Sequence, residues 1–256
     1  MQDARTYSAP SNMLLSVDVL GGIVCIYFAS LIMRIIGQHL FAGVGWGAAI
    51  GWESVWVMTV LVCLPVFPLG IQPLVNMTTT LRGLALEWPE LAFASIVMLE
   101  VLRMGMPAEW LGPLGFALSV GIAEELIFRV LLLGWLVTKV DVSKALLISA
   151  VIFGLAHLHE LSILGLASVI PQFAGGMVLG AVYLRTRNIL GPIIAHAYWD
   201  LPYFLAFGNG VSGGGTEAGF APLTQMLIWA GFTIYAIWLI RVRQPEPLMS
   251  RPQLRV

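Results

Sequence analysis

The sequence predicts an all-α membrane protein, a bundle of about eight transmembrane helices with both termini in the cytoplasm. Three observations predict it. Hydrophobic residues make up 59% of the chain and charged residues only 11%, against roughly 25% charged residues in a typical soluble domain. Apolar stretches of about 20 residues, the length of a membrane span, recur along the chain. Lysine and arginine gather on one side of the resulting topology. We therefore expect a multi-pass integral protein of the plasma membrane, with the lipid bilayer as a partner.

The apolar stretches set the order of the elements. The polar segment 1–13 precedes an apolar stretch too long for the core of a signal peptide, so that stretch is expected to stay as the first span. Three prolines predict a kink in the second span, and the short fifth span is expected to be tilted or partly re-entrant. Neither an internal repeat nor a soluble domain is visible, so residues 1–256 are expected to form a single transmembrane domain. The spans are predicted at 14–36, 54–75, 88–106, 113–137, 144–158, 163–184, 189–207 and 221–240.

The positive charges support this number of spans. With eight spans, both termini and the loops that follow even-numbered spans lie on one side of the membrane, which the positive-inside rule makes the cytoplasmic side. The opposite loops contain neither lysine nor arginine. The net charge of −1 gives no basic field for nucleic acid, so none is expected as a partner. The residues on the cytoplasmic side are Arg5, Arg82, Lys139, Lys144, Arg185, Arg187, Arg241, Arg243, Arg251 and Arg255.

Several ionisable residues nevertheless fall inside the spans. Glu124, Glu125 and Arg129 lie in the fourth span, where each charge would cost about 2.5–3.5 kcal/mol if unpaired. Glu125 and Arg129 stand four residues apart, on one face of a helix, and can neutralise each other. Glu124 is turned about 100° away from Glu125, so a partner for it has to come from another span.

Two other spans offer such partners. His157 ends the fifth span, and His196 and Asp200 lie within the seventh. At a rise of about 1.5 Å per residue from the nearest cytoplasmic charge, these three side chains and Glu124 reach a similar depth. A buried glutamate beside neutral histidines can activate water as a general base, and a histidine can stabilise an oxyanion. The cluster therefore predicts a hydrolytic site without a serine or cysteine nucleophile, since Cys25 and Cys63 lie in the first two spans.

Three short motifs occur in order, each in its own span. This arrangement resembles the CPBP family (CAAX protease and bacteriocin-processing, or Abi) of intramembrane glutamic proteases, and is similar to type II CAAX prenyl endopeptidases. The resemblance covers about residues 113–205, which it identifies as the catalytic core. The motifs are Glu124-Glu125-x-x-x-Arg129, Phe153-x-x-x-His157 and His196-x-x-x-Asp200.

The resemblance implies a role for each of these positions. Glu124 would be the base that activates water, assisted by His157, while Glu125 and Arg129 would hold the site together. The implied activity is cleavage of a peptide bond in a membrane-associated peptide or protein, including a prenylated one. Neither a cofactor nor a metal is expected.

The resemblance assigns oxyanion stabilisation to His196 and to the residue at position 200. The family pattern has asparagine or aspartate at this last position, and the best-studied members carry asparagine, whereas this chain carries Asp200. An aspartate donates a hydrogen bond only when it is protonated. Asp200 would therefore either donate in its protonated form or orient His196, which lies four residues earlier on the same helix face.

Three alternatives stay open. The cluster could belong to a non-catalytic scaffold or immunity protein of the same fold. A metal-dependent protease is a second alternative, because His157, His159 and Glu160 lie close together in the sequence, although Ile163 occupies the place where a zinc protease needs its second histidine. A small-molecule transporter is the third, since polar groups at mid-membrane also mark transport paths.

Overall fold

The structure, a computed structural model, is all-α. Its described residues contain helices and no β-strand, so the predicted all-α class is confirmed. The structure describes residues 21–29, 32, 36, 45–63, 69, 71, 73, 75–105, 108–158, 163–207 and 222–241. Besides a helical segment at 21–29, the elements are α2 (Trp46–Cys63), α3 (Met77–Leu86), α4 (Trp88–Met104), α5 (Leu111–Glu125), η2 (Leu126–Leu133), α6 (Gly134–Leu136), α7 (Val142–Ala156), α8 (Ile163–Thr186), α9 (Leu190–Phe207) and α10 (Pro222–Arg241).

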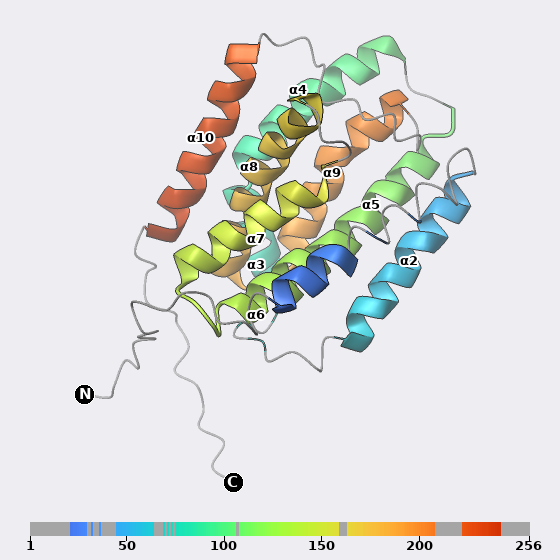
Figure 1. Ribbon diagram of the computed structural model, residues 1–256. Helices are drawn as coiled ribbons and strands as arrows, with labels where there is room; N and C mark the ends of the chain where they lie inside the picture. Colours follow the sequence, from blue (N-terminus) through green and yellow to red (C-terminus); the bar gives the residue numbers. More distant parts are fainter. Residues whose placement is uncertain are drawn as a thin grey trace.

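The helices form a bundle in which segments distant in sequence lie side by side (Figure 1). Helix α2 lies at one edge against α5, and α10 lies at the opposite edge against α8. Between these edges, α5 packs along α9 and α7 packs along α8. The helices that carry the three motifs are therefore neighbours in the middle of the bundle.

From residue 88 onward, the helices follow the predicted apolar stretches closely. Helix α4, for example, spans Trp88–Met104 where 88–106 was predicted, and α9 spans Leu190–Phe207 where 189–207 was predicted. Nearer the N-terminus the agreement is weaker. Helix α2 begins well before residue 54 and ends at Cys63, ahead of the prolines. The first predicted span, 14–36, lies only partly within the described residues.

Helix α3 was not predicted at all. It is short and rich in threonine, so a search for long apolar stretches passes over it. Its first turn is capped by Asn76, whose Oδ1 accepts the backbone N–H groups of Thr78 (2.9 Å) and Thr79 (3.3 Å). Helix α7 starts in the same way, since the carboxylate of Asp141 accepts the N–H of Lys144 at 3.0 Å. This backbone hydrogen bond lowers the pKa of Asp141.

The predicted span 113–137 is one continuous helical stretch with a change of winding in its middle. Residues Leu126–Leu133 form a π-helix, and α6 follows it directly. A π-helix bonds each N–H to the carbonyl five residues back, and such segments often occur at functional sites. This one begins immediately after Glu125, so it changes the direction in which Arg129 and the following side chains project.

Within the residues that the structure describes, none of the helices combines the length and the apolar character needed to cross a membrane. The bilayer location and the cytoplasmic termini therefore stay predictions.

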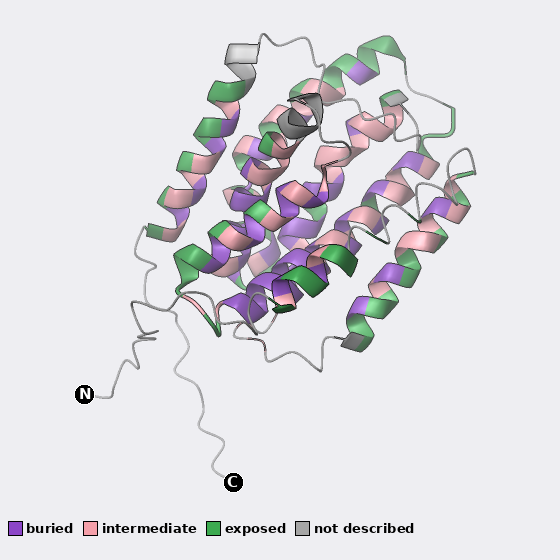
Figure 2. Cartoon of the chain, viewed as in Figure 1, coloured by how far each residue is buried: buried purple, intermediate pink, exposed green. Residues whose placement is uncertain are grey.

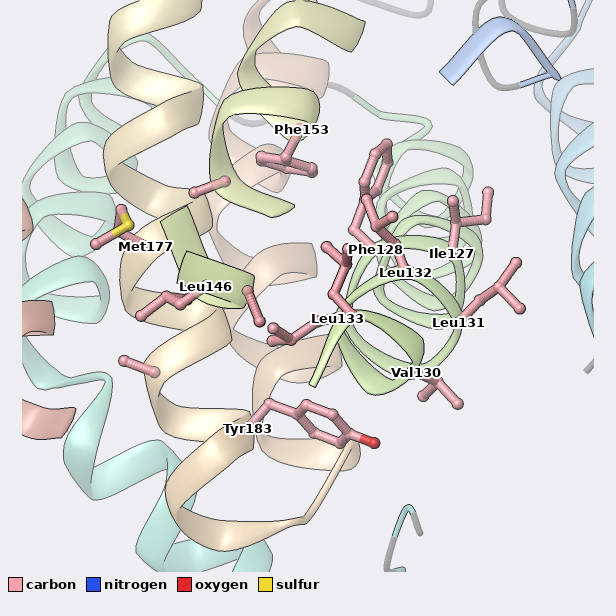
Figure 3. Close-up of a cluster of buried hydrophobic side chains, with 14 of the residues drawn as sticks. Ile127, Phe128, Val130, Leu131, Leu132, Leu133, Leu146, Phe153, Met177 and Tyr183 are labelled. Atoms are coloured by element: carbon pink, nitrogen blue, oxygen red, sulfur yellow. The ribbon is translucent and has the colours of Figure 1, made fainter. Parts of the chain in front are cut away.

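The most buried residues lie where η2, α7 and α8 meet, at the centre of the bundle (Figure 2). Leu132 and Leu133 of η2, Leu146 of α7 and Val178 and Tyr183 of α8 are fully buried there. Figure 3 shows that the rings of Phe128 and Phe153 lie close together in this cluster, and they make an edge-to-face contact with centroids 5.0 Å apart. The functional side chains described next are placed by this core.

A buried asparagine lies at the start of α9, the helix that carries His196. Asn188, which precedes α9, donates to the carbonyl of Asn76 (3.1 Å) and to Oγ1 of Thr79 (2.8 Å). Its Oδ1 accepts the N–H of Gly191 at 3.1 Å. The start of α9 is thereby joined to the start of α3, which fixes the height at which α9 enters the bundle.

Candidate active site

An ion pair within one helical stretch forms the base of the site. Glu125, the last residue of α5, and Arg129 of η2 are 0% and 1% exposed, and Arg129 Nε lies 3.1 Å from Glu125 Oε2. The Arg129 guanidinium also lies over the ring of Phe153, with Cζ 4.3 Å from the ring centroid. Two buried charges thus offset each other, and Phe153 links them to α7.

The same glutamate holds a histidine of α9. Nδ1 of His196 lies 2.7 Å from Oε1 of Glu125. Because the carboxylate of Glu125 is already paired with Arg129, it accepts this hydrogen bond and Nδ1 carries the proton. The contact fixes the ring of His196 and directs its Nε2 towards Glu124.

Glu124 lies between two imidazole rings. Its Oε2 is 3.6 Å from Nε2 of His157 and 3.7 Å from Nε2 of His196. Both distances exceed a direct hydrogen bond but suit groups that share a water molecule. Glu124 and Glu125 therefore face different nitrogens of the same histidine, His196, and Glu124 also faces His157.

His157 is held by its own helix. Its Nδ1 lies 2.8 Å from the carbonyl oxygen of Phe153, one turn earlier. A carbonyl oxygen can only accept, so Nδ1 donates, and a neutral His157 presents Nε2 as an acceptor. The residue ends α7, where the backbone leaves the helical conformation. The ring consequently faces Glu124 from the end of the neighbouring helix.

Asp200 completes the cluster from α9. Its Oδ2 lies 3.6 Å from Nε2 of His196, the nitrogen that also faces Glu124. The nitrogen that orients the His196 ring, Nδ1, is bound by Glu125 instead. The structure therefore places Asp200 beside the imidazole nitrogen that faces Glu124, while Glu125 binds the other ring nitrogen.

A close approach of α5 and α9 brings these residues together. A Cβ atom at Gly121 would lie 3.0 Å from the carbonyl oxygen of Ile193 and 3.3 Å from the backbone nitrogen of Ala197. A larger residue would push the two helices apart. Glycine at this position therefore allows Glu125, one turn later, to reach His196.

The comparisons with known proteins were made on the whole chain. Residues 106–202 match the family described as type II CAAX prenyl endopeptidase Rce1-like. These residues, the Rce1-like segment, are similar to that family. The family resemblance predicted from the three motifs is therefore confirmed, and all six predicted site residues lie within the matched segment. Neither a curated protein nor a solved structure matches the chain.

A serine within the Rce1-like segment supports the π-helix. Ser149 of α7 is buried, and its hydroxyl donates to the carbonyl of Phe128 at 2.9 Å. Replacing Ser149 with alanine removes this donor, so the free energy of unfolding is expected to fall by about 1–3 kcal/mol. Ser54 provides the matched control, because its hydroxyl bonds to Ile50 on an exposed helix face and its loss is expected to cost less than about 0.5 kcal/mol. Thermal unfolding of both variants in detergent measures the difference, and equal stabilities would contradict the role of Ser149.

Two acidic residues near the site were missed by the sequence analysis. Glu87 and Glu90, at the junction of α3 and α4, are buried and interact electrostatically with Arg129 and Glu125. They precede the Rce1-like segment. Glutamates at the start of a predicted span read as interface residues, so no signal in their local sequence could have drawn attention to them.

The metal alternative needs a cluster of ligating side chains. In the part of the chain that the structure describes, we find no group of three or more His, Cys, Asp or Glu side chains arranged to hold a metal ion. His159 and Glu160, on which that alternative also drew, lie outside the described residues.

Proposed function

We propose that this protein is an intramembrane endopeptidase that hydrolyses a peptide bond with a water molecule activated by Glu124. The observation that carries the proposal is the position of the Glu124 carboxylate between His157 Nε2 (3.6 Å) and His196 Nε2 (3.7 Å). A water between these groups could donate hydrogen bonds to Glu124, the base, and to Nε2 of His157, and could accept one from Nε2 of His196. The match to type II CAAX prenyl endopeptidase Rce1-like proteins supports a protease in particular.

The first step is attack by water. One hydrogen atom of the water forms a hydrogen bond to Glu124, and its other hydrogen atom forms one to the acceptor nitrogen of His157. A lone pair of the water oxygen is then directed at the substrate carbonyl. Glu124 removes the proton as the C–O bond forms, acting as a general base. His157 orients the water, and its own hydrogen bond to Phe153 keeps Nε2 available for this role.

The second step is stabilisation and collapse of the tetrahedral intermediate. With Nδ1 of His196 bound to Glu125, its Nε2 donates to the oxyanion as an imidazolium, whose charge the Glu125 carboxylate and the oxyanion offset. A protonated Asp200 can donate to the same oxygen. Glu124 then returns its proton to the leaving amine as the C–N bond breaks, so that the enzyme regains its starting state.

The substrate class follows from the family description. Its name refers to a prenyl endopeptidase acting on CAAX sequences, so we infer a C-terminal peptide of a prenylated protein as the first substrate to test. Another membrane-anchored peptide is the next, because the cluster is built for amide hydrolysis and contains nothing that reads a particular side chain.

A membrane location is part of the proposal. Large apolar side chains are exposed on the outer helices, including Met58 and Val62 of α2, Leu99 of α4, and Ile234 and Trp238 of α10. With hydrophobic residues at 59% of the chain, lipid is the solvent that suits these faces. The expressed protein should remain with membranes after an alkaline wash, and release into the soluble fraction would refute this location.

Peptide cleavage by the purified protein tests the function. A farnesylated C-terminal peptide and its unprenylated form are incubated with the protein in liposomes, with and without a chelator, and the products are identified by mass spectrometry. Cleavage that survives the chelator is the expected result. Loss of cleavage with the chelator, restored by added zinc, would replace the proposal with a metal-dependent protease. A well-folded protein that cleaves neither these peptides nor a pool of membrane-anchored peptides would favour a non-catalytic scaffold.

A further inference from the structure

Two buried glutamates outside the proposed mechanism call for a role of their own. Glu87 is the single residue between α3 and α4, and Glu90 lies in the first turn of α4. Their exposed fractions are 0% and 3%. Burying an ionised carboxylate costs several kcal/mol or more unless another group offsets the charge. Two such glutamates side by side therefore need a proton or a positively charged group nearby to offset their negative charge.

The hydrogen-bond pattern shows what the pair lacks. Within the described residues, both oxygens of Glu87 and Oε1 of Glu90 are buried without a hydrogen-bond donor. The two carboxyl groups nevertheless lie within hydrogen-bond reach of each other. Two ionised carboxylates can only accept hydrogen bonds and repel each other. A single proton between them supplies the missing donor and removes one of the two charges.

A buried arginine faces the remaining charge. Arg129 interacts electrostatically with both Glu87 and Glu90, and its side chain is 1% exposed. Its Nε is paired with Glu125, while Nη1 and Nη2 have no hydrogen-bond partner in the described part of the chain. The guanidinium thus has one anionic partner at Nε and two unpaired donors in the same field as the glutamate pair.

Helix α8 and the candidate site both adjoin the pair. A Cβ atom at Gly175 of α8 would lie 3.5 Å from Oε1 of Glu90, an ordinary contact distance, so α8 passes directly beside the carboxyl. Glu90 also interacts electrostatically with His196. The titratable and charged groups that face the pair are Glu125, Arg129, His196 and Tyr235, and Tyr235 itself donates to the carbonyl of Leu86 at 2.8 Å.

We propose that Glu87 and Glu90 share one proton and act together as a singly charged counterpart of Arg129, which positions the catalytic cluster from the side of α3 and α4. The pair is a set of positioning residues, because neither glutamate is among the groups that contact the activated water. Its negative charge favours the imidazolium form of His196, the form that donates to the oxyanion. The effect on catalysis rests on the proposed function, whereas the shared proton does not.

Infrared spectroscopy of the wild-type protein in liposomes tests the shared proton without any activity. The expected spectrum at neutral pH contains the carbonyl band of a buried protonated carboxyl group, which shifts when the solvent is exchanged for D₂O. The band should be lost in Glu87→Gln and in Glu90→Gln, since the glutamine amide replaces the shared proton as the donor and keeps the local contacts. Glu100→Gln is the matched control, because Glu100 lies on the same helix in an exposed pair with Arg103 and should leave the band unchanged. Absence of the band from the wild type, or its persistence in both variants, would overturn the proposal.

The pH dependence of peptide cleavage tests the positioning role. Replacing both glutamates with glutamine removes the pair's charge, so His196 loses its imidazolium form more readily. The alkaline limb of the rate profile should therefore move to lower pH in the double variant Glu87→Gln, Glu90→Gln, by on the order of one pH unit, whereas each single variant keeps one carboxylate charge and should move it less. Glu100→Gln should keep the wild-type profile. If the wild type cleaves peptide and the double variant keeps its profile, the positioning role is wrong. A wild type that cleaves nothing refutes the proposed function instead, and the infrared result then decides on the pair alone.

Discussion

Glu124→Gln is expected to reduce peptide cleavage by about 10²–10⁴-fold, the usual contribution of a general base. The glutamine side chain has nearly the same shape as glutamate, so it can keep the contacts with His157 and His196, but it cannot remove a proton from water. The measurement is the rate of product formation under single-turnover conditions, which isolates the chemical step from product release. We expect the loss in this rate constant and little change in the affinity for the peptide.

The control for this variant is a second glutamate-to-glutamine change away from the site. Glu100 pairs with Arg103 on an exposed face of α4, so Glu100→Gln should cleave at the wild-type rate. Both variants should unfold at the wild-type temperature, which separates a chemical defect from a folding defect. Retention of cleavage in a folded Glu124→Gln protein would show that another group activates the water.

Arg129→Met is expected to lower the free energy of unfolding by about 3–5 kcal/mol. Methionine has a similar volume and fills the space over the Phe153 ring, so the change removes the charge with little change in packing. Glu125 is then left as a fully buried carboxylate without its cation, and the charge on the Glu87 and Glu90 pair is also left without its counterpart. Denaturant unfolding in detergent, followed by tryptophan fluorescence, measures the loss.

The same substitution in an exposed pair provides the comparison. Arg103 and Glu100 form an ion pair of similar length, with Nε and Oε2 2.9 Å apart, but their side chains are 78% and 61% exposed. Water solvates both charges after Arg103→Met, so the expected loss is only about 0.2–1 kcal/mol. If the two variants were equally stable, Arg129 would not be neutralising buried carboxylates.

Much of the candidate site could be predicted from local spacing. Glu125 and Arg129 stand four residues apart, and a helix brings residues at that spacing onto one face whatever packs around it. The same regularity turned Glu124 away from Glu125, and the partners it required are the two histidines that the structure places beside it. The helices after residue 88 were predictable for a similar reason, because long apolar stretches have few other ways to satisfy their backbone groups.

The features that escaped prediction depend on contacts between distant segments. The π-helix at Leu126–Leu133 has an ordinary apolar sequence, and its support comes from Ser149 on another helix. The orientation of His196 depends on Glu125, which lies 71 residues earlier. Asp200, at helical spacing from His196, was a reasonable alternative until the packing of α5 against α9 placed Glu125 closer.

The sequence by itself thus determined the all-α class, the three motifs and the pairing within one helix, since each of these depends only on residues a few positions apart. The tertiary structure alone decided which side chains of α5, α7 and α9 converge, because helix packing sets those distances. It also decided that Glu87 and Glu90 are buried beside Arg129. The burial of a glutamate depends on the helices that surround it, and the residues next to it in the sequence do not indicate which helices those are.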